Sequence, residues 1–145
     1  MAQSSTTFAP GIRFISPTVK RMAKETLLQS CWLGYGEDKI LRMRVLDGAV
    51  IDLKQAKMIT ESMKRLADEV PVAVLIDGRQ NYTWDKDAQE YIALHSGYRL
   101  ATALITNNAV VRIFSNSYAK IFKPSYPFRI FSTEEKAIAW LKSLM

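Results

Sequence analysis

The sequence predicts an α/β domain in which strand–helix units surround a mixed, mostly parallel sheet. Two apolar runs, at residues 72–76 and 100–105, have no polar face, which is typical of strands buried on both sides in a parallel sheet. Amphipathic stretches, two of them with capping residues, alternate with the predicted strands along the chain. Consecutive units of this kind place their strands in parallel, joined by right-handed connections.

The N-terminal part predicts an antiparallel hairpin that leads into the strand–helix units. Residues 26–33 and 40–45 have the pattern of strands joined by a glycine-containing loop. In the second strand Arg42 and Arg44 alternate with apolar residues, which predicts that their face meets solvent or a partner. The preceding segment, residues 13–24, fits either a short strand or a helix.

Four strand–helix units follow, the first of which uses the second strand of the hairpin. Asp52 and Gln55 have capping-box spacing at the start of the first helix, and Ser132 with Glu135 has it at the start of the last. Gly97 is expected to end the second helix as its C-cap. The predicted elements are a helix from Asp52 to about Ala67, a strand at 72–77, a helix at 85–96, a strand at 100–105, a helix after 106–108, a strand at 128–131, and a last helix that packs Ala137, Ile138, Leu141 and Leu144.

Composition predicts a cytoplasmic globular protein of one domain. The 145 residues are 48% hydrophobic and carry a net charge of +6, and no apolar run approaches the roughly 18 residues that span a bilayer. The N-terminus lacks the pattern of a secretory signal, and one cysteine fits a reducing compartment. Residues 1–11 are expected to form a disordered tail before a single domain at residues 12–145. Because basic residues are scattered among acidic ones, we expect no nucleic-acid partner.

The sequence predicts no catalytic residue, no metal site and no cofactor, and therefore a non-enzymatic protein. His95 is the only histidine and Cys31 the only cysteine, which is too few for a zinc site. His95 falls in the last turn of a predicted helix without a nucleophile beside it. Cys31 is expected to lie in the core as a small apolar residue. Glycine-rich motifs that bind nucleotide phosphates are missing.

The polar segment after the strand at residues 72–77 is the candidate binding site, because ligands of α/β proteins meet the carboxyl ends of the strands. In one interpretation, Tyr82 and Trp84 anchor a partner and Arg79 supplies a charge. In the other, Asp77 and Arg79 pair to close the loop while Trp84 packs at the helix start. The candidate partner-binding residues are Asp77, Arg79, Tyr82, Thr83, Trp84, Asp85 and Lys86.

From about residue 26 to residue 144, the chain resembles the STAS-like superfamily of bacterial anti-sigma-factor antagonists. The order of elements, the sequence IDGR at 76–79 and the closing FSTEEKAIAWL at 131–141 carry the resemblance, which is nearest to an uncharacterised bacterial branch. The antagonists have an aspartate at the end of the strand and, eight residues later, an Asp-Ser-Ser-Gly turn that opens the partner-binding helix. Asp77 and Asp85 match the two aspartates. Lys86 stands at the position of the phosphorylated serine, so the resemblance implies a binding role without that phospho-switch.

Two functional hypotheses follow. The first is a regulatory or protein-interaction module that binds a protein partner or itself through the seven candidate residues and the second helix. A homodimer built through the Arg42 and Arg44 face or the N-terminal segment would be one form of self-association. The alternative is a binder of a small apolar or lipid-like ligand, in a pocket lined by Phe114, Ile121 and Phe122 and gated by Tyr82 and Trp84.

Overall fold

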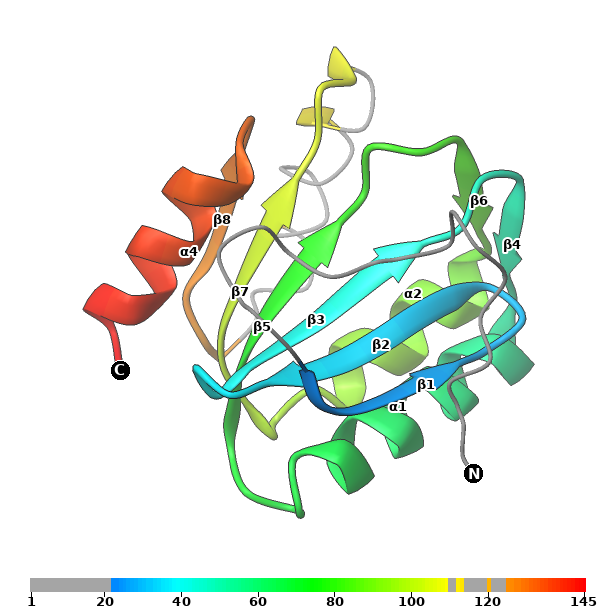
Figure 1. The fold of residues 1–145 in the computed structure, drawn as a ribbon. Coiled ribbons are helices and arrows are strands. Elements are labelled where there is room, and N and C mark those ends of the chain that lie inside the picture. Colours follow the sequence, from blue (N-terminus) through cyan, green and yellow to red (C-terminus); the bar gives the residue numbers. More distant parts are fainter. Residues whose placement is uncertain (1–21, 110–111, 114–119, 121–124) are drawn as a thin grey trace.

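The structure is a computed structural model that describes residues 22–109, 112, 113, 120 and 125–145 (Figure 1). Its strands and helices follow in the order β1 (Met22–Leu27), β2 (Cys31–Gly36), β3 (Ile40–Val45), β4 (Ala49–Ile51), α1 (Leu53–Leu66), β5 (Val72–Asp77), β6 (Tyr82–Trp84), α2 (Lys86–Leu94), β7 (Arg99–Ile105), β8 (Phe128–Phe131) and α4 (Glu134–Ser143). The predicted α/β class is confirmed.

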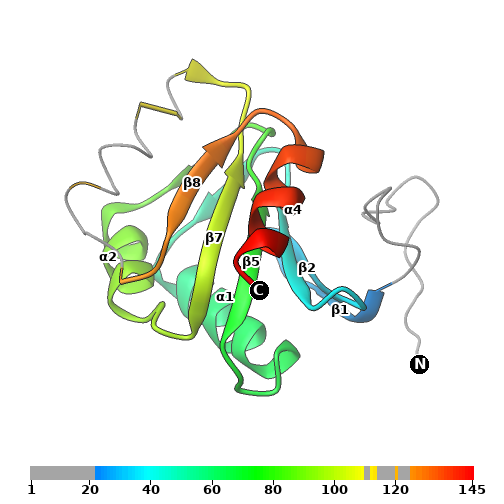
Figure 2. The ribbon, with the colours of Figure 1, turned by 90° about the vertical axis from the view of Figure 1, so that its left-hand side faces the viewer.

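Six strands form the main sheet in the order β1-β2-β3-β5-β7-β8. The first three pair antiparallel, whereas β3, β5, β7 and β8 pair in parallel. The sheet is therefore mixed and mostly parallel, as the uniformly apolar runs predicted. Figures 1 and 2 show α1 and α2 on one side of the sheet and α4 on the other.

Alternate residues of the central strands build two separate cores. On the side of α1 and α2, Leu41 and Val74 pack with helical residues such as Ile59 and Met63. On the side of α4, Ala73, Ala101 and Ala103 pack with Ala137 and Leu141 of that helix. Both faces of β5 and β7 are thus buried, which explains why these strands show no polar alternation.

A second, two-stranded sheet lies at the carboxyl ends of β3 and β5 and was not predicted. Strands β4 and β6 pair in parallel, with Val50 opposite Thr83. The backbone N–H of Asp85 also donates to the carbonyl of Ile51 at 2.9 Å. This small sheet therefore places the N-termini of α1 and α2 side by side (Figure 1).

The boundaries of the N-terminal hairpin differ from those predicted. The strand expected at 26–33 is broken by a turn, in which Leu28 N–H donates to the Cys31 carbonyl at 2.8 Å. Strand β2 instead runs on through Gly34 to Gly36. At Gly36 a Cβ atom would lie 2.5 Å from Asp38 Oδ1 and 2.7 Å from Arg42 Nη1. This glycine is therefore a strand residue that makes room for two charged side chains, and not part of a flexible loop.

The helix ends confirm one predicted cap and correct others. Asp52 accepts a hydrogen bond from Gln55 N–H at 2.8 Å, as predicted. Helix α2 ends at the C-cap His95, and Gly97 does not have the left-handed backbone expected of a C-cap glycine. The last helix is capped by Thr133, one residue after the expected Ser132. Leu144, expected in the core, is exposed because it follows the end of α4.

Replacing Thr133 with alanine is expected to lower the free energy of unfolding by about 1 kcal/mol, because the Lys136 N–H loses its acceptor at 3.3 Å. Thermal or urea denaturation would measure the change. Ser132→Ala is the matched control and should leave stability within about 0.5 kcal/mol. A larger effect at Ser132 than at Thr133 would contradict this assignment of the cap.

Three expectations concern residues outside the described ranges. The tail at residues 1–11 lies wholly outside them, and so does the start of the domain up to residue 21. Most of the helix expected after residue 108 does too; within it, Arg112 N–H donates to the Asn108 carbonyl at 2.9 Å. In the part of the chain that is described, no helix is long and apolar enough to cross a membrane.

Candidate functional site

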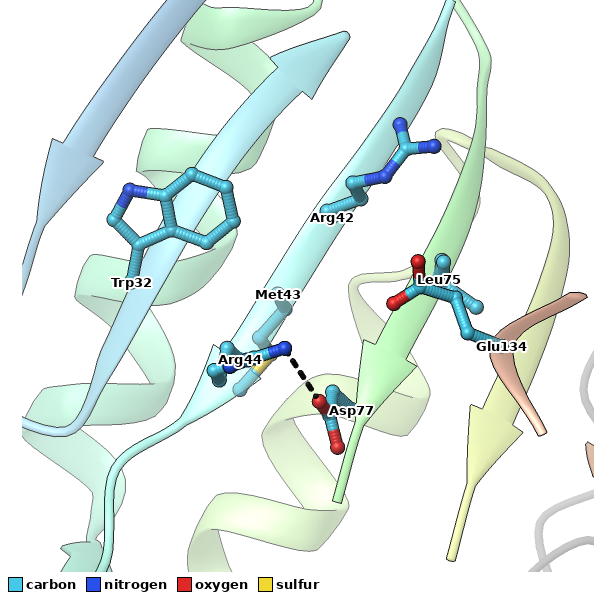
Figure 3. Close-up of a pocket in the computed structure, with 7 residues that line it drawn as sticks. All are labelled: Trp32, Arg42, Met43, Arg44, Leu75, Asp77 and Glu134. Atoms are coloured by element: carbon cyan, nitrogen blue, oxygen red, sulfur yellow. Dashed lines mark ion pairs between the residues drawn. The ribbon is translucent and has the colours of Figure 1, made fainter. Parts of the chain in front are cut away.

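The carboxyl end of β5 carries an ion-pair hub centred on Asp77. Arg79 donates to both oxygens of the Asp77 carboxylate, from Nε at 2.9 Å and from Nη2 at 2.8 Å. Arg44 reaches the same carboxylate from β3 at 3.1 Å (Figure 3). The pairing of β3 with β5 places Arg44 opposite Asp77. Asp77 is only 9% exposed, so the hub holds the loop after β5 closed.

The environment of Asp77 keeps its carboxylate ionised. Burial alone raises the pKa of Asp77, but the hydrogen bond and charge of Arg79, followed by the charge of Arg44, outweigh it and hold the pKa below its usual range. Tyr82 lies nearby, and burial together with the charge of Asp77 raises the pKa of its hydroxyl. A Cβ at Gly78 would come within 2.9 Å of that hydroxyl, so a side chain at this position would have to displace Tyr82.

Acidification is expected to destabilise the protein through its buried ion pairs. The pKa of Asp38 is also lowered: its burial raises it, but the hydrogen bond and charge of Arg42 outweigh this. Because both folded pKa values lie below 3.8, the ordinary value of an aspartate, their contribution to stability is fully present above about pH 4 and is lost as the pH falls through the folded values. Urea denaturation between about pH 7 and pH 2.5 measures the loss. A free energy of unfolding that stays constant below pH 4 would contradict it.

The candidate partner-binding residues divide into an inner and an outer group. Asp77 and Arg79 bind each other, and Tyr82 packs against the core on the α1 and α2 side. The Asp77–Arg79 pair that one of the two interpretations predicted is therefore present. The outer group, Thr83, Asp85 and Lys86, is exposed.

Trp84 lies between the two groups. Its half-buried side chain packs against the core on the α1 and α2 side, and its carbonyl accepts from Gln89 Nε2 at 3.2 Å. Asp85 occupies the N-cap position of α2, but its side chain makes no capping hydrogen bond. The start of α2 is thus held by Trp84 and by the backbone of β4 rather than by the Asp85 carboxylate.

Two residues of this region were missed by the sequence analysis. Val50 of β4 lies opposite Thr83 and is 58% exposed, and Leu53 at the start of α1 is also exposed. A three-residue strand is too short to produce a periodic signal, so the pairing that brings Val50 to Thr83 could not be read from the sequence. We call the group of Val50, Leu53, Thr83, Asp85 and Lys86 the outer rim.

The arginine face of β3 is not the free surface that its alternation predicted. Arg42 is only 5% exposed and donates to both oxygens of Asp38, at 3.0 and 2.9 Å. Arg44 is engaged by Asp77. The predicted exposure is wrong for Arg42, which is buried against a carboxylate of its own chain, and Arg44 is partly covered. A homodimer stays a prediction.

Cys31 and His95, the other side chains considered for reactive chemistry, do not join the ion-pair hub. Cys31 is fully buried, and burial, partly offset by a hydrogen bond with Ser30, raises the pKa of its thiol to about 12. His95 stacks on Tyr91 with ring centroids 4.0 Å apart, at the far end of α2. Within the described ranges, no group of three His, Cys, Asp or Glu side chains could hold a metal ion. Phe114, Ile121 and Phe122, expected to line an apolar pocket, lie outside those ranges.

The antiparallel entry, the parallel strands and the rim at their carboxyl ends define a STAS-like α/β domain. An uncharacterised protein of the DUF3478 family from Shewanella loihica PV-4, which has a SpoIIAA-like fold, is similar in structure with a TM-score of 0.56. The two sequences are 13% identical over 81% of this chain and 90% of that chain, so the likeness concerns the fold alone. Residues 34–145 match DUF7793, a domain of unknown function, and the chain belongs to this family. No curated protein matches the chain.

Proposed function

We propose that this protein is a non-enzymatic cytoplasmic interaction module that binds a protein partner through the outer rim and the adjoining face of α2. The exposure of Val50 beside Thr83 carries the proposal. A branched apolar side chain is held in solvent on a strand pair that is anchored to two helix starts. An exposed apolar side chain with polar groups around it matches the arrangement of an interface, in which a polar rim surrounds an apolar centre.

The resemblance to the anti-sigma-factor antagonists supports the same surface. In those proteins the corresponding helix is the partner-binding surface, and a serine at the position of Lys86 is phosphorylated as a switch. Lys86 is exposed and cannot be phosphorylated as a hydroxyl can. Binding through this surface is therefore expected to be constitutive, and a complementary partner would present a carboxylate to Lys86 and an apolar contact to Val50.

The chemistry of Asp77 supports a binding role over a catalytic one. Both carboxylate oxygens accept hydrogen bonds from Arg79, and the pKa of the group is lowered. A general base at neutral pH works best with a pKa near 7, whereas Asp77 is shifted in the opposite direction. Its role in the proposal is to hold Arg79 and the loop that leads to the outer rim.

A capture experiment with the full chain tests the proposal. The immobilised protein is exposed to a lysate of its source organism, and captured proteins are quantified by mass spectrometry. Val50→Glu with Lys86→Glu should reduce capture of a specific partner by about tenfold or more, because a charge then replaces the apolar anchor and the cation is reversed. Analytical ultracentrifugation of the same samples tests whether the partner is a second copy of this chain.

A matched double variant controls for the loss of a valine and a lysine in general. Val70 is 59% exposed and precedes β5 at the opposite end of that strand, and Lys136 is exposed on α4. Val70→Glu with Lys136→Glu should retain the partner, and both double variants should keep the circular dichroism spectrum of the parent. Equal capture by all three proteins, together with an unchanged sedimentation coefficient, would contradict the assignment of the outer rim.

A further inference from the structure

The outward face of α1 carries a row of cations, on the side of the sheet opposite α4 (Figure 1). Buried residues of α1, such as Ala56, Ile59 and Met63, lie on the other face of the helix. At 1.5 Å per residue, the row extends for roughly 16 Å along the helix. We call this row the basic stripe; its members are Lys54, Lys57, Lys64 and Arg65.

The cations of the basic stripe are not neutralised by carboxylates of the described chain. The ion pairs between described side chains involve Lys24, Arg42, Arg44 and Arg79, and no member of the basic stripe. Glu61, the one acidic residue of α1, is exposed and is also outside those pairs. Four cations with one acid among them leave a strip of positive charge that faces outwards.

The positions of two of these cations oppose the stability of the helix itself. Lys54 lies in the first turn of α1, which contains no acidic residue, and the dipole of a helix disfavours a cation there. Lys54 and Lys57 are three residues apart, so they are neighbours on the helix surface and repel each other. Departures of this kind from local rules are expected at functional sites.

Aromatic rings hold two of the cations in place. Lys57 Nζ lies 5.9 Å from the ring centroid of Tyr91 on α2, and Lys64 Nζ lies 5.9 Å from that of Tyr98. Such contacts orient a long side chain but use none of its three N–H donors. A carboxylate that approaches the basic stripe therefore meets cations that have less freedom to lose on binding.

The helix beside α1 limits the shape of an anionic partner. Helices α1 and α2 lie in one layer on the same side of the sheet (Figure 1), and α2 carries an exposed Asp87 and a half-buried Glu90. A bilayer surface or a nucleic-acid duplex is broad enough to meet these carboxylates as well, and like charges repel. The positive strip is one helix wide, which fits a single acidic segment.

We propose that the basic stripe binds an acidic helix of another protein, which lies along α1 with its carboxylates on one face. Side chains three and four residues apart share a face of a helix, so a row of carboxylates can meet the row of cations when the two helices pack about 8–10 Å apart. Met58, one turn after Lys54 and 38% exposed, offers that helix an apolar contact. The proposal does not depend on the outer rim, because none of the four cations belongs to it.

Two synthetic peptides of about 18 residues test the proposal, at a length that allows an isolated helix to form. Both contain the same alanines, glutamines and glutamates, but the glutamates lie on one face of the first helix and all around the second. The one-face peptide should shift the α1 amides of the full ¹⁵N-labelled chain along a saturable curve. We expect a dissociation constant on the order of 0.1 mM in about 20 mM salt, and binding about tenfold weaker in about 150 mM salt, which screens exposed charges. The second peptide should bind at least about fivefold more weakly than the first.

Substitutions by glutamine separate the basic stripe from the net charge of the protein. Lys57→Gln with Lys64→Gln should weaken binding of the one-face peptide by about fivefold or more, because two ion pairs are lost. Lys136→Gln with Lys142→Gln removes the same charge from exposed positions of α4, and this matched control should stay within about twofold of the parent. Glu61→Gln should tighten binding by about twofold, because it removes a repelling carboxylate. All variants should keep the circular dichroism spectrum of the parent.

Equal binding of the two peptides, equal losses in the two double variants, or shifts centred away from α1 would overturn the proposal. Phosphatidylserine vesicles and a DNA duplex of about 16 base pairs are titrated at the same salt concentration. If either binds more tightly than the one-face peptide and loses affinity in Lys57→Gln with Lys64→Gln, the occupant is a membrane or a nucleic acid and the acidic helix is wrong. Weaker binding of both supports the acidic helix.

Discussion

Replacing Asp38 with alanine is expected to lower the free energy of unfolding by about 3 kcal/mol, because it leaves the guanidinium of Arg42 buried without a counter-charge. The Arg42 side chain is 5% exposed and that of Asp38 is 15% exposed. Their two hydrogen bonds of 3.0 and 2.9 Å are joined by a third, from Ile40 N–H to Asp38 Oδ1 at 3.2 Å. Urea denaturation at pH 7 measures the change. If only stability is altered, the slope of the free energy of unfolding against urea concentration should stay the same.

The double variant Asp38→Ala with Arg42→Met separates the cost of an unpaired charge from the value of the pair. Methionine fills a similar volume without a charge, and replacing a buried ion pair by apolar residues is often neutral. The double variant should therefore recover most of the stability that the single variant loses. Glu61→Ala on the exposed side of α1 is the surface control and should cost less than about 0.5 kcal/mol. A double variant as unstable as Asp38→Ala would show that packing of the arginine stem, and not its charge, carries the effect.

The burial of Arg42 could not be predicted from the sequence. Alternation along β3 correctly separated two faces of a strand, but it could not tell which faces the rest of the protein covers. Because Arg42 and Asp38 are close in sequence, their pair is formed by the hairpin turn itself, and Gly36 provides the space for it. An arginine in an alternating pattern is most often exposed, so local pattern alone predicts the wrong environment.

The central strands were predictable because their sequence pattern does show that both of their faces are covered. Residues 72–76 and 100–105 are apolar on both faces. A strand needs apolar residues on both faces only when both faces are covered by other parts of the protein. The N-caps of α1 and α4 were predictable to within one residue, as the shift from Ser132 to Thr133 shows, because both residues can supply the capping oxygen. Strands β4 and β6 were not predictable, since three residues carry no usable period.

The candidate site was predictable only where its residues are neighbours in the chain. Asp77 and Arg79 are two residues apart, and their pairing was one of the two interpretations of the loop. Arg44 joins them from a strand 33 residues earlier, through the parallel register that places Arg44 opposite Asp77. The register is a property of the assembled sheet, so the third member of the hub had to come from the structure.

Replacing Asp77 with asparagine is expected to lower the free energy of unfolding by about 2 kcal/mol, because two arginines lose their shared counter-ion. Asparagine keeps the shape of the side chain, so the loss reports the charge and the bidentate hydrogen bonds of Arg79. The expected cost is smaller than for Asp38→Ala, because the side chains of Arg44 and Arg79 are 28% and 35% exposed and are partly solvated once released.

The aspartate eight residues later provides the matched control. Asp85 is exposed and makes no capping hydrogen bond with its side chain, so Asp85→Asn should change stability by less than about 0.5 kcal/mol. Asp77→Asn should also flatten the loss of stability below pH 4, since one of the two carboxylates with a lowered pKa is then missing. Equal effects of the two substitutions would mean that the hub does not hold the loop. A large effect of Asp77→Asn with an unchanged pH profile would assign the effect to packing rather than to charge.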